Sequence, residues 1–244
     1  MHSVHRFDRL SSTQDELHRL AAANAPAGTI VVAVEQGAGR GSRGRAWASP
    51  PGGLWLSFLC RPARAIGAEV LSIRVGLAAA DALVEVGGLP PIRLKWPNDL
   101  MTGDRKVGGI LCEARWQGEA LAWVSVGIGL NVRNDPPVAA RLPAASLGEW
   151  RPDLEPDHVL WPLVTRLESL AELGTPLSGG ELAAFAGRDW LAGRELAAPI
   201  PGLADGITAD GALRILRSDG TTTALRSGDV TPAVELAGSA ITGH

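Results

Sequence analysis

Runs of apolar residues and their periods divide the chain into a long first part with extended elements and a shorter second part with brief ones. The β-branched run at residues 29–35 and the apolar run at 54–60 predict buried strands. Apolar residues recur at spacings of three and four between residues 66 and 86, the period of a helix with one buried face. Thr13-Gln14-Asp15-Glu16 fits the capping box of another helix. This helix is predicted over residues 13–23, and two further helices are predicted over residues 156–173 and 179–190.

The centre of the chain predicts short strands and turns. IRLKW, residues 92–96, is a short strand, and the runs 106–115 and 120–132 form a hairpin through Gln117-Gly118-Glu119. Residues 133–148 hold three prolines and no clear period, which predicts a long loop. Long loops in compact domains are often functional.

After Gly193 the helical period ends. Short apolar segments at 195–198, 213–216 and 222–225 alternate with Asp-Gly turns at 205–206, 210–211 and 219–220, a pattern typical of a small β-barrel. We therefore expect an α+β protein with a first domain over residues 1–191 and a second over 192–244.

Charge and composition then narrow the class of protein. The net charge is −3 and no run of 18 apolar residues occurs, so we expect neither a nucleic-acid nor a membrane partner. The first residues, MHSVHRFDRL, lack the apolar core of a signal peptide, and we expect a cytoplasmic location. Cys60 and Cys112 lie in apolar runs without a metal-binding spacing, which predicts buried thiols and no metal ligands.

The stretch GAGRGSRGRAW, residues 37–47, gathers three arginines and four glycines. Its GxGxxG pattern would suit a dinucleotide turn, but Pro50 and Pro51 prevent the helix that should follow, and no acid lies about twenty residues later. Arg45-Ala46 stands where a P-loop needs Lys and Ser or Thr. Glycines let backbone N–H groups approach an anion and arginines add charge, so an anion site and a solvated basic loop both remain possible.

Two later motifs favour a binding site. Lys95-Trp96-Pro97-Asn98-Asp99 combines a cation, an aromatic ring, an amide and a carboxylate, although taken alone it could be only a turn. Gly108 and Gly109 follow Arg105-Lys106 in a strand, where paired glycines suggest close approach of a ligand. In the run 127–131, GIGLN, alternate glycines point to one face and end at an amide.

In order and separation these motifs resemble those of the biotin–protein ligases. The motifs are Ser12-Thr13-Gln14-Asp15, the loop 36–45 with Trp47, KWPNDL at 95–100, RKVGGIL at 105–111 and GIGLN at 127–131. The resemblance implies a mixed-sheet catalytic core flanked by helices, of the class II synthetase type shared with lipoate ligases, and a small C-terminal SH3-like β-barrel.

The resemblance also implies a two-step ligase reaction. Biotin and MgATP would give biotinyl-5′-AMP and pyrophosphate, and a lysine of a biotin carboxyl carrier domain would then attack the mixed anhydride. Neither step needs a nucleophile from the enzyme, and the residues agree, because the motifs offer arginine and lysine but no Ser–His–Asp set. ATP and biotin would be substrates, Mg²⁺ would be carried by ATP, and no tightly bound prosthetic group is implied.

Motif position assigns residues to biotin. Ser12, Thr13 and Gln36 would hydrogen-bond its ureido head, although the first two could simply cap a helix. Lys106 would bridge the biotin carboxylate and the α-phosphate, and Arg40 would contact the same region. The full set implied for biotin is Ser12, Thr13, Gln36, Gly39, Arg40, Gly41, Lys106, Gly108, Gly109, Gly127 and Gly129.

Motif position also assigns the nucleotide and the chemistry. The nucleotide would contact Arg43, Trp47, Asn98 and Asn131, with core packing as the alternative for Trp47. The catalytic set implied is Arg40, Lys106, Lys95 and Asp99. Asp99 could orient Lys106, help to hold Mg²⁺ or accept a proton from the incoming lysine, and the sequence leaves the three open.

This chain departs from the family pattern at two positions. Ser42 stands where some members have an arginine that helps to retain the adenylate, and Gln14 stands where the family has asparagine, a change that we interpret as tolerated. We expect the loop 133–148 to be mobile and to close on the nucleotide. Because the Ser-Thr motif begins at residue 12, we expect no N-terminal DNA-binding domain.

Two rival functions remain. A lipoate or octanoyl ligase or transferase would share the core fold, and a biotin sensor would bind without catalysis. KWPND and GRGSRGR favour biotin, and the presence of both Arg40 and Lys106 favours an enzyme. The expected partner is the biotin carboxyl carrier domain of acetyl-CoA carboxylase or a related carboxylase, and monomer and homodimer both remain possible.

Overall fold

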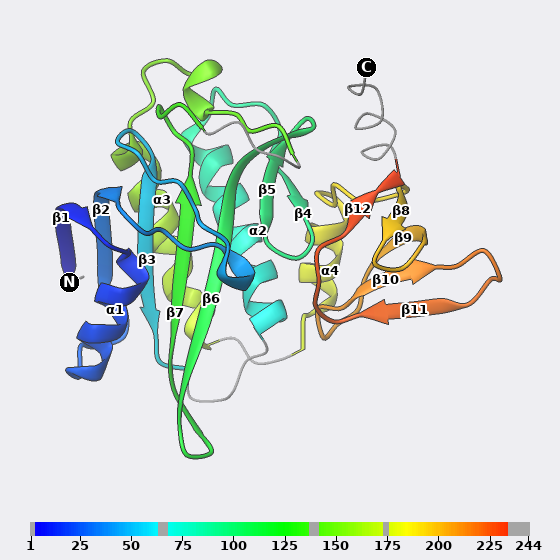
Figure 1. Cartoon of the computed structure of the whole chain (residues 1–244), viewed down its shortest axis with the longest axis horizontal. Coiled ribbons are helices and arrows are strands. Elements are labelled where there is room, and N and C mark those ends of the chain that lie inside the picture. The colour runs from blue at the N-terminus through cyan, green and yellow to red at the C-terminus, as the bar shows by residue number, and fades with distance from the viewer. Residues whose placement is uncertain (1–2, 63–67, 137–141, 173–175, 234–244) are drawn as a thin grey trace, which may run out of the picture.

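The computed structural model describes residues 3–62, 68–136, 142–172 and 176–233 (Figure 1). Seven strands form the first sheet: β1 (Val4–Leu10), β2 (Ile30–Gln36), β3 (Leu54–Cys60), β4 (Arg93–Lys95), β5 (Asp99–Thr102), β6 (Arg105–Gln117) and β7 (Ala120–Leu130). Their order across the sheet is β1-β2-β3-β7-β6-β5-β4. β1 runs parallel to β2 and every other neighbouring pair is antiparallel, so the mixed sheet and α+β class expected from the sequence are confirmed.

Helices cover both faces of this sheet. They are α1 (Thr13–Ala22), α2 (Ala68–Val86), α3 (Pro156–Glu168) and α4 (Gly179–Ala186). Ile30 and Val32 of β2 pack in the large core with α2 and α3, whereas Val31 packs with Leu17 of α1. Since successive side chains of a strand point to opposite faces, α1 lies on the face opposite α2 and α3. This double coverage explains why the apolar runs of β2 and β3 do not alternate with polar residues.

A second, five-stranded antiparallel sheet follows the core. It contains β8 (Glu195–Ala198), β9 (Gly202–Ile207), β10 (Leu213–Leu216), β11 (Thr222–Leu225) and β12 (Thr231–Pro232), in the order β11-β10-β9-β8-β12. It packs beside α4 and the β4–β5 end of the first sheet (Figure 1) and agrees with the expected small SH3-like domain. The exact division at residues 191 and 192 stays a prediction.

Several local predictions were wrong. The helix α1 is capped by Ser12, whose side chain accepts from the Gln14 backbone N–H, rather than by a box that starts at Thr13. The Asp-Gly pair 205–206 is no turn: it lies inside β9, where Gly206 has a φ of 74° and the register with β10 shifts. Gly206 thus supplies the left-handed residue of a bulge, which Asp-Gly suits as well as it suits a turn.

Other predicted bounds need adjustment. α3 ends at Glu168 and continues as a 3₁₀ turn over Ser169–Glu172, and α4 ends at Ala186 rather than at residue 190. The strands β1, β5, β9 and β12 were not predicted. Within the described residues no helix combines the length and apolar character needed to cross a membrane.

Candidate active site

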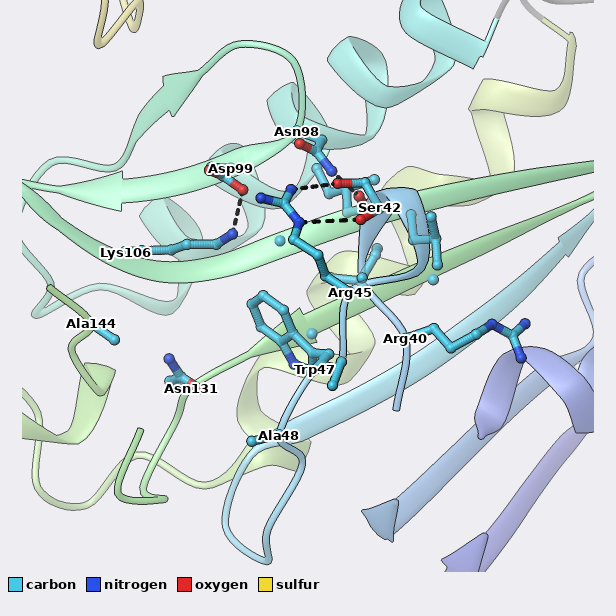
Figure 2. A pocket seen from close by; sticks show the side chains of 18 of the residues that line it. Arg40, Ser42, Arg45, Trp47, Ala48, Asn98, Asp99, Lys106, Asn131 and Ala144 are labelled. Atoms are coloured by element: carbon cyan, nitrogen blue, oxygen red, sulfur yellow. Dashed lines mark hydrogen bonds and ion pairs between the residues drawn. The ribbon is translucent and has the colours of Figure 1, made fainter. Parts of the chain in front are cut away.

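A cavity of about 410 Å³ lies on the α1 side of the sheet, beneath the glycine–arginine loop. Strands β6 and β7 form its floor, and residues 40–48 pass over it (Figure 2). The structure brings these predicted residues together around it: Ser12, Thr13, Gln36, Arg40, Gly41, Trp47, Lys95, Asn98, Asp99, Lys106, Gly109, Gly127, Gly129 and Asn131. Gly39, Gly108 and Arg43 do not line it.

One end of the cavity is polar and built at the start of α1. The Thr13 backbone N–H and hydroxyl both donate to Gln36 Oε1, at 2.7 and 3.1 Å. The Ser57 hydroxyl donates to Thr13 Oγ1 at 2.8 Å, and Gln36 Nε2 donates to Ser49 Oγ at 2.7 Å. Buried hydroxyls and amides are therefore held in fixed orientations before any ligand binds, which suits recognition of a polar group.

Gln14 belongs to this polar end, although we interpreted it only as a tolerated change. Its Nε2 donates to the Leu111 carbonyl at 3.0 Å, and its Oε1 accepts from Ser125. A Cβ on Gly127 would lie 2.9 Å from Gln14 Nε2, so Gly127 makes room for the amide beside the cavity. The position of Gln14 immediately after Ser12-Thr13 was the sequence feature that could have identified this residue.

Trp47 packs on the glycines of the floor. A Cβ on Gly109 would lie 3.1 Å from Trp47 Cζ3, and one on Gly129 would lie 2.6 Å from its Nε1. The glycines thus provide a flat surface for the indole ring rather than contacting only a ligand. The buried Trp47 Nε1 has no hydrogen-bond partner among the described residues.

Gly39 and Gly108 serve packing around the cavity instead of lining it. A Cβ on Gly39 would lie 2.6 Å from Ser49 Oγ, and one on Gly108 would lie 2.8 Å from the Gly129 carbonyl oxygen. Both positions exclude larger residues because the backbone or a fixed side chain is already there.

A charged cluster marks the other end of the cavity (Figure 2). Lys106 Nζ contacts Asp99 Oδ1, and Lys95 Nζ lies 3.9 Å from Asp99 Oδ2. Lys106 Nζ also lies 4.9 Å from the centre of the Trp47 ring, within the range of a cation–π contact. Hairpin pairing explains this cluster, because Lys95 is opposite Asp99 in the β4–β5 register.

The two predicted asparagines lie around the same end, Asn98 held by the backbone and Asn131 by another asparagine side chain. Asn98 Nδ2 donates to the Ile110 carbonyl at 2.6 Å, and Asn134 Nδ2 donates to Asn131 Oδ1 at 3.1 Å. Each therefore has at least one group already in use, and Asn131 is buried.

The arginines of the loop face carboxylates. Arg40 contacts Asp15 and Glu113, and its side chain points away from Lys106 in Figure 2. Arg45 donates to Ser42 Oγ at 2.8 Å and to Asp229 Oδ2 at 2.7 Å, while Arg43 Nη1 lies 3.5 Å from the same Asp229 oxygen. Arg45, which we did not predict, lines the cavity, and Arg43 does not.

The remaining walls come from segments far away in the chain. Asp229, Val230 and Thr231 reach the cavity from the second sheet, and Leu142 and Ala144 from the loop after β7. The Lys106 N–H donates to the Pro143 carbonyl at 2.8 Å, which ties this loop to the edge of β6. Residues 137–141, the centre of the predicted closing loop, lie outside the described residues.

The strand register separates the two ends of the cavity. The polar end lies over β3, where Ser57 is opposite Gly127, and Asp99 lies on β5, three strands away. At the usual strand spacing the ends are about 14 Å apart. Trp47, Leu111 and Ala144 lie among the lining residues. The cavity therefore fits an elongated ligand with a polar head, an apolar chain and an anionic end.

Comparison with known proteins agrees with this chemistry. The profile of the biotin/lipoate A/B protein ligase family matches residues 6–131, just over half of the chain. The chain belongs to this family.

Relatives within the family carry ligase names. The bifunctional ligase/repressor BirA of Bacillus subtilis is 40% identical over 131 residues, which are 53% of this chain and 40% of the relative. The biotin–[acetyl-CoA-carboxylase] ligase of Paracoccus denitrificans is 39% identical over 140 residues, which are 57% of this chain and 58% of that protein. The match thus spans about half the length of these relatives.

Solved structures of family members are similar over nearly the whole chain. The biotin protein ligase of Aquifex aeolicus in complex with biotin and ATP has a TM-score of 0.79 and 28% identity, covering 94% of this chain and 98% of that one. The ligase of Leishmania major in complex with biotinyl-5-AMP has a TM-score of 0.66 and 26% identity, covering 92% and 99%.

Proposed function

We propose that this protein is a biotin–protein ligase that forms biotinyl-5′-AMP from biotin and MgATP and transfers the biotin to a lysine of a carrier domain. One observation carries the proposal: the cavity joins the polar end at Ser12, Thr13 and Gln36 to the Lys95–Asp99–Lys106 cluster along an apolar floor. A ureido head, a valeryl chain and a carboxylate follow one another in biotin in this order.

In the first step the biotin carboxylate attacks the α-phosphorus of ATP and pyrophosphate leaves. Two anions must meet, so a cation between them lowers the barrier. Lys106 is the candidate, because its ammonium lies in the cavity against Trp47 and is held there by Asp99. Mg²⁺ would enter with ATP and offset the charge of the leaving phosphates.

In the second step the amine of the acceptor lysine attacks the carbonyl carbon of the anhydride and AMP leaves. Of the three roles left open for Asp99, orientation of Lys106 has the strongest support, since both carboxylate oxygens face a lysine ammonium.

The nucleotide would occupy the end of the cavity near Asn98, Asn131 and Trp47. Arg45 extends this set, because it lines the cavity where Arg43 does not. The departure at Ser42 has a consistent explanation: its hydroxyl accepts from Arg45 and helps to hold that guanidinium at the rim.

We propose as acceptor the biotin carboxyl carrier domain of acetyl-CoA carboxylase or a related carboxylase, as the names of two relatives suggest. The absence of operator binding, the cytoplasmic location and the choice between monomer and homodimer stay predictions.

The decisive experiment incubates the protein with MgATP and either biotin or lipoate and measures pyrophosphate release, followed by mass analysis of a carrier domain. Biotin-dependent release and a biotinylated carrier support the proposal. Release with lipoate alone would identify a lipoate ligase, and binding of biotin without pyrophosphate would identify a sensor.

A further inference from the structure

The loop that covers the cavity is a small hairpin, residues 39–47. Arg40 pairs with Ala46 in an antiparallel bridge. The Gly41 N–H donates to the Arg45 carbonyl and the Trp47 N–H to the Gly39 carbonyl, both at 2.8 Å. These few bonds close the hairpin on itself, so other contacts must fix its position over the sheet.

Arg40 makes such a contact with the core. Its guanidinium contacts Asp15 of α1, and its Nη2 donates to Glu113 Oε2 of β6 at 2.9 Å. Glu113 does not line the cavity, and the Arg40 head points away from the Lys106–Asp99 pair (Figure 2). Arg40 thus ties the hairpin to a helix and a strand that are far from it in sequence.

Glu113 is itself held in place by two partly buried hydrogen bonds in series. Trp123 Nε1 donates to His18 Nδ1 at 2.9 Å, and an indole N–H can only donate. His18 therefore carries its proton on Nε2, which donates to Glu113 Oε2 at 3.2 Å. The hydrogen bond from His18, together with Arg40, lowers the pKa of Glu113 to about 2, so the carboxylate is charged at any physiological pH.

We propose that Glu113 is a positioning residue that acts through Arg40: it holds the hairpin 39–47 down, so that Trp47 lies on Gly109 and Gly129 and encloses the ligand. Arg40 is then a tether of the hairpin instead of the phosphate ligand expected from the motif. Turning Arg40 towards a phosphate would leave Glu113, three-quarters buried, without its cation. The consequence for ligand binding rests on the proposed function, but the tether does not.

A first test needs no ligand. Hydrogen exchange of the segment 39–47, followed by mass spectrometry in the free protein, compares wild type with Glu113→Gln and Arg40→Gln. Both variants should speed exchange about tenfold. Glu119→Gln, the same substitution at an exposed site in the turn of the hairpin β6–β7, should leave the exchange rate unchanged. Equal protection in all four proteins would overturn the tether.

A second test uses a double-mutant cycle in pyrophosphate release with biotin and MgATP. Each single variant should raise the biotin KM about tenfold and change kcat by less than twofold. The double variant Glu113→Gln/Arg40→Gln should be no worse than Arg40→Gln alone, because Glu113→Gln removes a contact that Arg40→Gln has already removed. Effects that multiply, or a fall in kcat in Arg40→Gln alone, would return Arg40 to the phosphate and refute the proposal.

The two tests separate this proposal from the proposed function. If wild type released no pyrophosphate, the ligase assignment would fail while the exchange experiment still decided the tether. Thermal unfolding of each variant checks the fold, and Arg40→Gln, with its partly exposed side chain, provides the second variant should Glu113→Gln prove unstable.

Discussion

Asp99 is the residue around which the charges of the cavity are balanced. It contacts Lys106 and lies near Lys95, and Lys95 is buried. A buried ammonium is costly without a counter-ion, so Asp99 supplies the counter-charge for both lysines within a largely apolar site. The cluster is therefore prepared to receive anions before they arrive.

Replacing Lys106 tests whether its ammonium stabilises the negative charge that develops during adenylation. Lys106→Gln should lower the rate of pyrophosphate formation by about 100-fold or more, the usual cost of losing one preorganised group at a developing charge. The fold should survive, since the side chain is partly exposed. Arg115→Gln, at an exposed position on the same strand β6, is the matched control. A rate within twofold of wild type would remove Lys106 from this role.

Gly129 is a steric test of the cavity floor. In Gly129→Ala the new Cβ would lie 2.6 Å from Trp47 Nε1, so the indole must move. We expect the biotin and ATP KM values to rise about tenfold. The free energy of unfolding, measured with urea, should fall by about 1–2 kcal/mol. Gly37→Ala, in the loop that leads to Trp47 and with only the Leu10 carbonyl oxygen near its new Cβ, at 3.9 Å, should change neither. Unaltered KM values in Gly129→Ala would show that Trp47 does not shape the site.

At the scale of elements, the pattern predicted most segments, including the four-residue strands β8, β10 and β11, and missed β1, β5, β9 and β12. The apolar runs of β2 and β3 and the period of α2 are local properties, and each was correctly predicted. β1, VHRFDRL, is largely polar and becomes a strand only because β2 offers it an edge to pair with. Such pairing is a non-local property that a single window of sequence does not contain.

The same limit applies to the site. Glycines and lysines within compact motifs could be assigned, because β4–β5 and β6–β7 are hairpins that join neighbouring residues. Glu113, His18 and Asp229 could not be assigned from the sequence. Their hydrogen-bond partners, Arg40, Trp123 and Arg45, are 73 to 184 residues away in the chain. No motif spacing encodes those contacts.

The start of α4 predicts a dependence of stability on pH. Glu181 caps the helix at Ser178 and pairs with the buried Arg74, whose Nε donates to it at 2.6 Å. The hydrogen bond from Arg74 lowers the pKa of Glu181 from 4.5 to about 2. A lowered pKa means that the carboxylate contributes stability above pH 4.5 and loses it as the pH falls towards 2.

Glu181→Gln should therefore lower the free energy of unfolding by about 2–3 kcal/mol at pH 7. The difference from wild type should shrink by more than half by about pH 3, because protonation then removes the same charge from the wild type. Urea unfolding at a series of pH values measures this, with the exposed Glu119→Gln as control. A difference that stayed constant with pH would contradict the pairing with Arg74.

At the scale of the whole molecule, the second sheet is part of the cavity. Trp96 Nε1 donates to the Gly211 carbonyl at 2.9 Å, which joins the turn after β9 of the second sheet to the first sheet beside Lys95. Asp229 then holds Arg43 and Arg45 from the other side of the arginine loop. The hairpin is thus fixed by the first sheet through Arg40 and by the second through Asp229.

Asp229→Asn should weaken ATP binding without disabling chemistry. Removing the carboxylate leaves Arg43 and Arg45 to repel each other and frees Arg45 from its place at the cavity rim. We expect the ATP KM to rise several-fold and kcat to stay within about twofold of wild type. The free energy of unfolding should fall by about 1 kcal/mol or less, because both arginines are about half exposed.

The matched control is Asp205→Asn, which breaks an ion pair with Arg214 inside the second sheet and away from the loop. It should leave the ATP KM unchanged. In an Arg45→Gln background, Asp229→Asn should add little, because the main contact is already lost. Should Asp229→Asn and Asp205→Asn give the same ATP KM, the second sheet would only pack against the site, and the arginine loop would depend on the first sheet alone.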